Sequence, residues 1–291
     1  MLDGALPYLR CPVCRRPLSR HERALRCPDG HSFDMAKQGY ADLSAGRLPH
    51  TGDSAEMIAD RSAFLAAGHY AFIATALAEA ASLTVDPPLT AAAPLADVPV
   101  EAAPSVVREM VLDAGTGTGD YLARVLDAAP AAVGLGLDVS KPALRRAARS
   151  HPRAAAVLTD LWRPLPVADA AASVIINVFA PRNGQEFRRV LRPDGRLLVV
   201  TPAADHLTEL ITAYGLLQVD PDKAGRVSES LDEHFTPAGS TTHRRMLTLT
   251  ATEARTLIGM TPSARHVAPA DLPTDAVTVT AAVNLTTYRP R

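Results

Sequence analysis

The chain has 291 residues, of which 47% are hydrophobic and 21% charged, and its formal net charge is −1. This length accommodates one full α/β domain and a smaller unit, and the apolar runs fall short of the roughly 20 residues that cross a bilayer. The balanced charge excludes a protein that coats nucleic acid by bulk attraction, and we expect no membrane partner.

The first 50 residues contain all three cysteines but no basic stretch followed by an apolar one, so we expect no signal peptide and predict a cytoplasmic protein. An odd cysteine count suits metal binding better than a disulfide framework. The motifs CPVC and CPDGH supply four candidate ligands: Cys11, Cys14, Cys27 and His31. Two short pairs of such ligands favour a closed, tetrahedral and therefore structural Zn²⁺ site. The alternative is buried apolar cysteines beside an incidental histidine.

The basic residues of the chain are concentrated in this same segment. Residues 1–50 hold eight Lys and Arg against five Asp and Glu, a surplus of three positive charges. Small zinc folds with a basic face commonly position a nucleic-acid backbone, although a solvated charged surface is the simpler alternative.

Three blocks differ in composition, and we predict a zinc-binding module at 1–50, a helical segment with a linker at 51–105 and an α/β domain at 106–291. The helical segment runs from Ser54 to Leu83. Repeated prolines between Thr84 and Pro104 break helices, and they have no backbone N–H to donate a hydrogen bond within a sheet. These residues therefore indicate a surface linker.

From residue 106 onward, strand and helix patterns alternate. Short runs of Val, Ile and Leu bounded by Gly, Pro and Asp predict strands buried on both faces of a parallel sheet. The expected strands are 106–115, 133–140, 155–160, 171–180 and 195–202, with helices at 121–129 and 142–150. Beyond them we expect a helix at Asp205–Leu217, a polar loop, a strand at Arg244–Thr250, a short helix from Ala251 and a last strand at Ala276–Tyr288. The predicted fold class is α/β, a Rossmann-like domain with a small N-terminal zinc module.

The segment VLDAGTGTGDY places Asp113 at a strand end and Gly115, Gly117 and Gly119 in the following turn. Glycine permits positive φ and the close approach of a ligand. A nicotinamide-binding loop prefers G-x-G-x-x-G, and Asp113 would repel a pyrophosphate. The same carboxylate could orient the cationic amino end of S-adenosylmethionine, which favours methyl transfer.

Two further acids end the next two predicted strands. Asp138 lies roughly 20 residues beyond the loop, where a carboxylate can accept hydrogen bonds from both ribose hydroxyls. Asp160 could contact the adenine amine. The alternative is a chance glycine turn with aspartates that cap helices. At the fourth strand end, Asn177 could hydrogen-bond a base edge, or the segment to Pro181 is simply a proline-terminated turn.

Three segments after the zinc motifs carry a family resemblance: FDMAKQGYADL (33–43), GDSAEM (52–57) and FLAAGHY (64–70). In this order they resemble the RlmA family of 23S rRNA guanine-N1 methyltransferases. The tylosin-resistance (TlrB) branch, which modifies nucleotide 748 rather than 745, is the most similar. The resemblance implies a Rossmann-like catalytic domain that uses S-adenosylmethionine and a zinc module that recognises rRNA.

The resemblance also implies site residues and partners. The cysteines and histidine named above would ligate zinc, and four further residues fall at cofactor contacts of the family: Tyr70, Gly117, Thr118 and His206. Hairpin 35 of 23S rRNA would be the substrate, a homodimer the assembly and macrolide resistance the phenotype. The alternatives are an inactive RNA-binding protein or a small-molecule methyltransferase of antibiotic biosynthesis. The base that accepts the guanine N1 proton stays unassigned among Asp160, His206 and His69.

Overall fold

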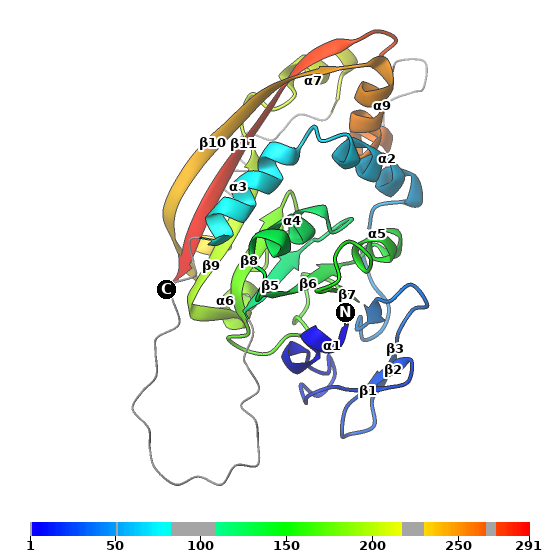
Figure 1. Ribbon diagram of the computed structural model, residues 1–291, viewed down its shortest axis with the longest axis vertical. Helices are drawn as coiled ribbons and strands as arrows, with labels where there is room; N and C mark the ends of the chain where they lie inside the picture. The colour runs from blue at the N-terminus through cyan, green and yellow to red at the C-terminus, as the bar shows by residue number, and fades with distance from the viewer. Residues whose placement is uncertain (1, 51, 83–108, 217–229, 266–271) are drawn as a thin grey trace.

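A computed structural model describes residues 2–50, 52–82, 109–216, 230–265 and 272–291 of the chain (Figure 1). The predicted linker from Thr84 to Pro104 lies outside the described residues. One large sheet carries helices on both faces, and the N-terminal module packs against one of these faces.

Eight strands form the large sheet, in the order β10-β11-β9-β8-β5-β6-β7-β4. Their bounds are β4 Ala41–Asp42, β5 Met110–Ala114, β6 Val133–Asp138, β7 Ala154–Leu158, β8 Ala172–Val178, β9 Leu191–Pro202, β10 Phe235–Leu249 and β11 Val277–Pro290. The strands from β4 to β9 are parallel, whereas β11 and β10 are antiparallel additions. From β5 the chain proceeds outward through β6 and β7, and then returns to β8 on the other side of β5. Ligands of such sheets bind at this reversal, outside the carboxyl ends of the strands.

The helices are short, with at most 12 residues each. They are α1 Leu2–Ala5, α2 Ala55–Ala66, α3 Ala71–Ser82, α4 Asp120–Ala128, α5 Lys141–Ala147, α6 Gly184–Val190, α7 Thr208–Tyr214 and α9 Ala251–Gly259, with 3-10 turns η1 Leu6–Tyr8 and η2 Pro262–Arg265. A separate antiparallel sheet in the N-terminal module comprises β1 Ser19–His21, β2 Ala24–Arg26 and β3 Ser32–Asp34.

Two hydrophobic clusters cover the two faces of the large sheet. Successive side chains of β5 alternate between them, with Val111 in the cluster of α3 and α4 and Leu112 in the opposite one. The opposite cluster also contains Leu9 and Leu25 of the N-terminal module and Phe187 of α6, all fully buried. The N-terminal module therefore shares the core of the α/β domain, and β4 extends the same sheet beside β7.

The predicted helical stretch from Ser54 to Leu83 is two helices. Ser54 caps α2, because its side chain accepts a hydrogen bond from the Met57 N–H. The chain turns at Gly68, whose φ of +82° favours glycine, before α3 begins. Within the described ranges no single helix is long and apolar enough to span a membrane, and α2 and α3 meet that test only as a pair bent by 78°.

The predicted polar loop before Arg244 is partly wrong, because β10 already begins at Phe235. Most side chains of β10 are exposed, since the strand lies at the edge of the sheet and pairs only with β11. The alternation of apolar and polar residues that signals a half-buried strand is therefore missing. The final strand, the helix after Ala251 and the parallel strands β5 to β9 are as predicted, whereas the short parallel strand β4 was not predicted.

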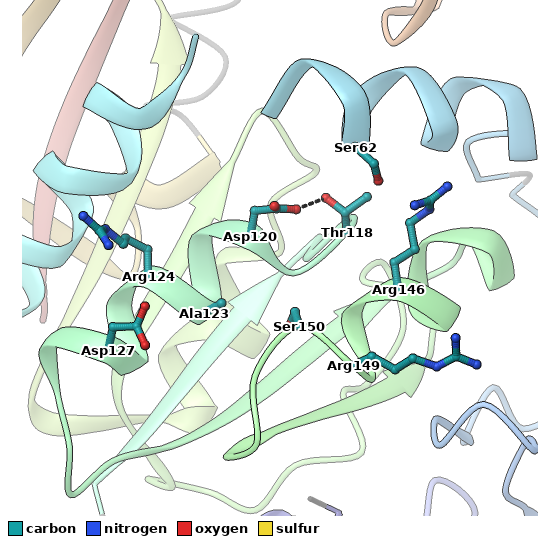
Figure 2. Close-up of a pocket in the computed structure, with 9 residues that line it drawn as sticks. All are labelled: Ser62, Thr118, Asp120, Ala123, Arg124, Asp127, Arg146, Arg149 and Ser150. Atoms are coloured by element: carbon teal, nitrogen blue, oxygen red, sulfur yellow. Dashed lines mark hydrogen bonds between the residues drawn. The ribbon is translucent and has the colours of Figure 1, made fainter. Parts of the chain in front are cut away.

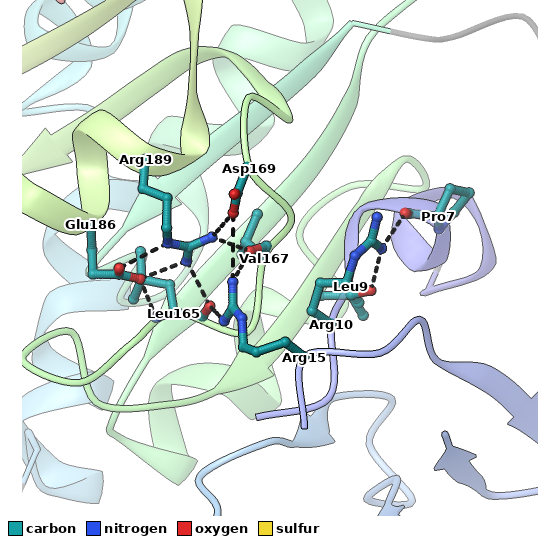
Figure 3. Close-up of polar contacts among 9 residues, drawn as sticks. All are labelled: Pro7, Leu9, Arg10, Arg15, Leu165, Val167, Asp169, Glu186 and Arg189. Atoms are coloured by element: carbon teal, nitrogen blue, oxygen red, sulfur yellow. Dashed lines mark hydrogen bonds and ion pairs between the residues drawn. The ribbon is translucent and has the colours of Figure 1, made fainter. Parts of the chain in front are cut away.

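A pair of arginines joins the N-terminal module to the loop that follows Asp160 (Figure 3). Arg15 donates to the carbonyl oxygens of Leu165 and Val167 at 2.6 and 2.9 Å. Arg189 of α6 donates to the same two oxygens at 3.0 and 2.8 Å, and Glu186 accepts from both the Arg189 guanidinium and the Leu165 N–H. The loop is thereby fixed against both the module and α6.

We expect Arg189→Ala to lower the free energy of unfolding by about 2–4 kcal/mol, because Glu186 and two carbonyl oxygens lose charged donors. Arg188→Ala is the matched control, since its guanidinium makes one exposed hydrogen bond to the Arg291 carbonyl. Urea titration of both variants measures the difference. Equal losses would contradict a stabilising role of the arginine pair.

Candidate functional site

The glycine loop after β5 is held to the end of β6. The N–H groups of Gly115 and Thr116 both donate to the Leu137 carbonyl at 2.9 Å, and the Gly117 N–H donates to Asp138 Oδ2 at 2.8 Å. Gly115 has a φ of +87°, and a Cβ there would lie 2.3 Å from the Cβ of Ala180. The loop therefore requires glycine for its conformation and for its close approach to the chain after β8.

A cavity of about 660 Å³ lies over this loop, a volume typical of cofactor sites. Seven of the nine predicted cofactor residues line it: Tyr70, Gly115, Gly117, Thr118, Asp138, Asp160 and His206. The other two, Asp113 and Gly119, do not. Gly119 is instead the N-cap residue before α4, with a φ of +86°, and a Cβ there would lie 2.6 Å from Ser150 Oγ. Its glycine is explained by packing, and a cofactor contact of Gly119 stays a prediction.

Asp138 and Asp160 present carboxylates to the cavity from the ends of β6 and β7. The two oxygens of Asp138 accept from the N–H groups of Ser140 and Gly117, both at 2.8 Å. Burial raises the pKa of Asp138, and these two hydrogen bonds oppose that effect. Each oxygen keeps a second lone pair, which could accept a ribose hydroxyl.

Asp160 is 4% exposed in its side chain and accepts from the Trp162 N–H at 3.0 Å. Its other oxygen lies 2.9 Å from Nδ1 of His50, whose side chain is 54% exposed. His50 belongs to the segment between the N-terminal module and α2. Nothing in the sequence pattern indicated that this histidine reaches the cavity.

Asp113 lies beneath the glycine loop, where its Oδ2 accepts from the Thr116 hydroxyl at 2.7 Å. Burial raises its pKa to about 7, against the lowering effect of that hydrogen bond. The predicted contact between this carboxylate and a cofactor amino group stays a prediction.

Tyr70 and His206 meet at one wall of the cavity, with the Tyr70 hydroxyl 3.4 Å from His206 Nε2. His206 Nδ1 accepts from the Ala282 N–H at 3.1 Å, which assigns the proton to Nε2 in the neutral ring. Burial lowers the pKa of His206 to about 4. His69 pairs with Glu253 at 3.0 Å and does not line the cavity, so of the three candidate bases only Asp160 and His206 lie at the cavity.

Arg61 of α2 covers the glycine loop, and no sequence motif indicated this position. Its guanidinium forms an ion pair with Asp53 at 2.6 Å and donates to the Met260 carbonyl at 3.1 Å. A Cβ at Gly117 would lie 3.3 Å from Arg61 Nη1. The signature GDSAEM contains Asp53, but its pattern does not indicate an ion pair at the cavity.

Asn177 at the end of β8 is fully buried, which favours a structural role over contact with a base edge. Its amide donates to the carbonyl oxygens of Ala114 and Pro181 at 2.9 and 3.0 Å. Asn177 therefore fixes the turn that follows β8.

The four predicted metal ligands gather in one cluster. The ligand atoms of Cys11, Cys14, Cys27 and His31 all lie within 4.8 Å of one another. His31 Nδ1 is 3.7 Å from Cys11 Sγ and 3.2 Å from Cys27 Sγ, and the Cys14 and Cys27 sulfurs are 3.6 Å apart. A tetrahedral site with Zn–S bonds of about 2.3 Å has ligand separations of about 3.8 Å. The cluster therefore fits Zn²⁺ with three thiolates and one imidazole.

A polar groove of about 290 Å³ adjoins the glycine loop on the outer side of α4 and α5 (Figure 2). Three exposed arginines line it, Arg124, Arg146 and Arg149, and none forms an ion pair with another described residue. The groove also contains two acids: Asp120 accepts from the Thr118 hydroxyl, and Asp127 lies 3.5 Å from His151 Nε2. Three arginines against two acids give the groove a net positive charge.

The parallel sheet with its glycine loop and strand-end carboxylates fits a methyltransferase, and the three-cysteine, one-histidine cluster joined to it fits a zinc ribbon. Family models support both parts: residues 9–45 match the N-terminal zinc ribbon of RlmA, and residues 111–195 match a methyltransferase domain.

Curated relatives cover most of the chain. It is 58% identical to a Micromonospora griseorubida protein assigned to the 23S rRNA (guanine-N(1)-)-methyltransferases, over 100% of both chains. It is 45% identical to the 23S rRNA (guanine(748)-N(1))-methyltransferase of Streptomyces fradiae, over 94% of this chain and 91% of that one. The chain belongs to the family of 23S rRNA (guanine-N1) methyltransferases.

We expect His31→Ala to lower zinc affinity by at least about 100-fold and to lower the melting temperature, because the ribbon shares the core of the large sheet. His21→Ala is the matched control, since His21 is exposed in the same module. Metal content and thermal unfolding measure both effects. Full zinc retention by His31→Ala would contradict the ligand assignment.

The raised pKa of Asp113 predicts a pH-dependent stability. The folded state binds this proton more tightly than the unfolded state, so the contribution to stability is present in acid and is lost between about pH 4 and 7. Between pH 5 and 8 the wild type should lose about 2–3 kcal/mol more unfolding free energy than Asp113→Asn. Urea titrations test this, with exposed Asp127→Asn as the control. If the difference in unfolding free energy between the wild type and Asp113→Asn did not change with pH, this would contradict a buried, protonated carboxyl at Asp113.

Proposed function

We propose that the chain transfers a methyl group from S-adenosylmethionine to N1 of a guanine in the hairpin 35 loop of 23S rRNA. The observation that carries this proposal is the 45% identity, over nearly the whole chain, to an enzyme named for guanine 748. The same similarity favours nucleotide 748 over 745. Methylation there would hinder macrolides such as tylosin, and work on ribosomal RNA implies a cytoplasmic protein.

The cavity supports S-adenosylmethionine as the cofactor. Asp138 would accept hydrogen bonds from the ribose hydroxyls, and Asp160 would accept one from the adenine amine. The left-handed loop at Gly115 and Gly117 lets a ligand approach the backbone closely. The amino acid portion would then lie over the ends of β5 and β8, near Tyr70.

The residues of the chain would contribute mainly by positioning the two reactants and by excluding water from the cavity. S-adenosylmethionine supplies an electrophilic methyl group when bound. The turn that Asn177 fixes and the wall of Tyr70 and His206 would align guanine N1 with that group. His206 stays neutral at physiological pH because burial lowers its pKa to about 4, and both its ring nitrogens are engaged. Guanine N1 must also lose a proton, and the acceptor stays unassigned.

Two basic surfaces suit the rRNA backbone. The zinc ribbon would recognise the hairpin through its arginines, and Arg146 and Arg149 of the groove beside the cavity offer unpaired charge to phosphates. Following the family resemblance, we propose a homodimer that forms a cleft for the hairpin.

Incubation of the purified protein with labelled cofactor and unmodified 23S rRNA tests the activity, and primer extension with mass spectrometry locates the methylated guanine. We expect one product at N1 of nucleotide 748. Label on a small molecule but never on RNA would contradict the proposed substrate.

Gly117→Val should abolish cofactor binding by calorimetry, because a side chain there meets Arg61 and blocks the loop. The control is Gly46→Val, since Gly46 has a φ of +114° but no neighbour within 4 Å of an added Cβ. Normal cofactor affinity of Gly117→Val would contradict the loop assignment, whereas equal loss in both variants would indicate strain alone.

A further inference from the structure

Two aromatic side chains that line the cavity, Trp162 and Phe179, are exposed to solvent. Among the described residues, only four large apolar side chains are exposed: Val13, Trp162, Phe179 and Met246. Phe179 is 43% and Trp162 56% exposed, and these two lie at the cavity. Flat aromatic faces open to solvent are what unstacked bases bind.

The two rings lie at opposite ends of the cavity. Trp162 follows Asp160 at the end of β7, and Phe179 follows β8. Because β5 and β6 separate these strands, the two ends are three strand spacings apart, roughly 14 Å. Asp138 and Asp160 place the adenosine at the β6 and β7 end. Phe179 is thus at the end where the methyl group would be presented.

The backbone of Phe179 is held in a conformation that its side chain disfavours. Its φ is +51°, in the left-handed region that favours glycine. The Asn177 amide, which donates to the Pro181 carbonyl, and the contact between Gly115 and Ala180 fix this turn. The Phe179 ring lies 5.9 Å from the His206 ring, tilted by 39°, and part of the side chain remains exposed to solvent. A strained, exposed phenylalanine is a poor choice for stability alone.

We propose that Phe179 is the surface on which the extruded target guanine stacks, which orients N1 toward the methyl group. The inference rests on the proposed function, because it needs an RNA base in the cavity. Extrusion from a hairpin loop costs less than from a duplex, and stacking on the ring offsets part of that cost. The Asn177 turn and the His206 ring fix the plane that the base meets.

Two substitutions separate stacking from a structural role. Phe179→Gly removes the ring and relieves the left-handed backbone, so the free energy of unfolding should stay equal or rise. Its kcat/KM on a synthetic hairpin 35 RNA should fall about 5- to 150-fold, the range for loss of one stacked base. Affinity for S-adenosylhomocysteine by calorimetry and for a hairpin with an abasic target position should stay within twofold. Phe179→Tyr keeps the aromatic face and should retain wild-type kinetics.

Wild-type kcat/KM in Phe179→Gly would overturn the stacking role, as would a loss in Phe179→Tyr equal to that in Phe179→Gly. A parallel loss of S-adenosylhomocysteine affinity would assign Phe179 to the cofactor instead. Failure of the unchanged enzyme to methylate any 23S rRNA hairpin would overturn the proposed function itself, and with it this inference. The stability measurement keeps these outcomes apart from misfolding.

Discussion

The hydrogen bond from the Gly117 N–H to Asp138 Oδ2 is the interaction on which the site depends. It ties the glycine loop after β5 to the end of β6, beside the two bonds that the loop donates to the Leu137 carbonyl. The loop cannot move without displacing the carboxylate assigned to the ribose. This arrangement requires a positive φ at Gly115 and Gly117, and both glycines line the cavity.

The same sheet joins the zinc ribbon to this cavity. Leu9 and Leu25 of the ribbon pack into the core below the parallel strands, and β4 extends the sheet beside β7. The segment after β4 then supplies His50 and Asp53 to the cavity wall. The zinc ribbon and the cavity proposed for the cofactor are therefore joined by one continuous sheet and one wall.

Local patterns in the sequence predicted much of the fold. Buried strands, the glycine turn and the acids Asp138 and Asp160 follow from short apolar runs and their endings. The pairing of β4, the exposed first half of β10 and the His50 contact depend on segments far apart in the chain, which no local period reveals. Tyr70 and His206 entered through the family resemblance alone, because an aromatic core residue and a helix-start histidine carry no chemical signal in isolation. The ring of Phe179 looked like part of a buried strand, and only its left-handed backbone and exposure distinguish it.

The central claim is that adenosine binds over the ends of β6 and β7, and the chain contains one tryptophan with which to test it. Trp162 follows Asp160 at that end of the cavity. Titration with S-adenosylhomocysteine should change Trp162 fluorescence in a saturable way, with the same dissociation constant as calorimetry, and Gly117→Val should show no change. Saturable binding by calorimetry without any change in Trp162 emission would contradict this placement of the cofactor.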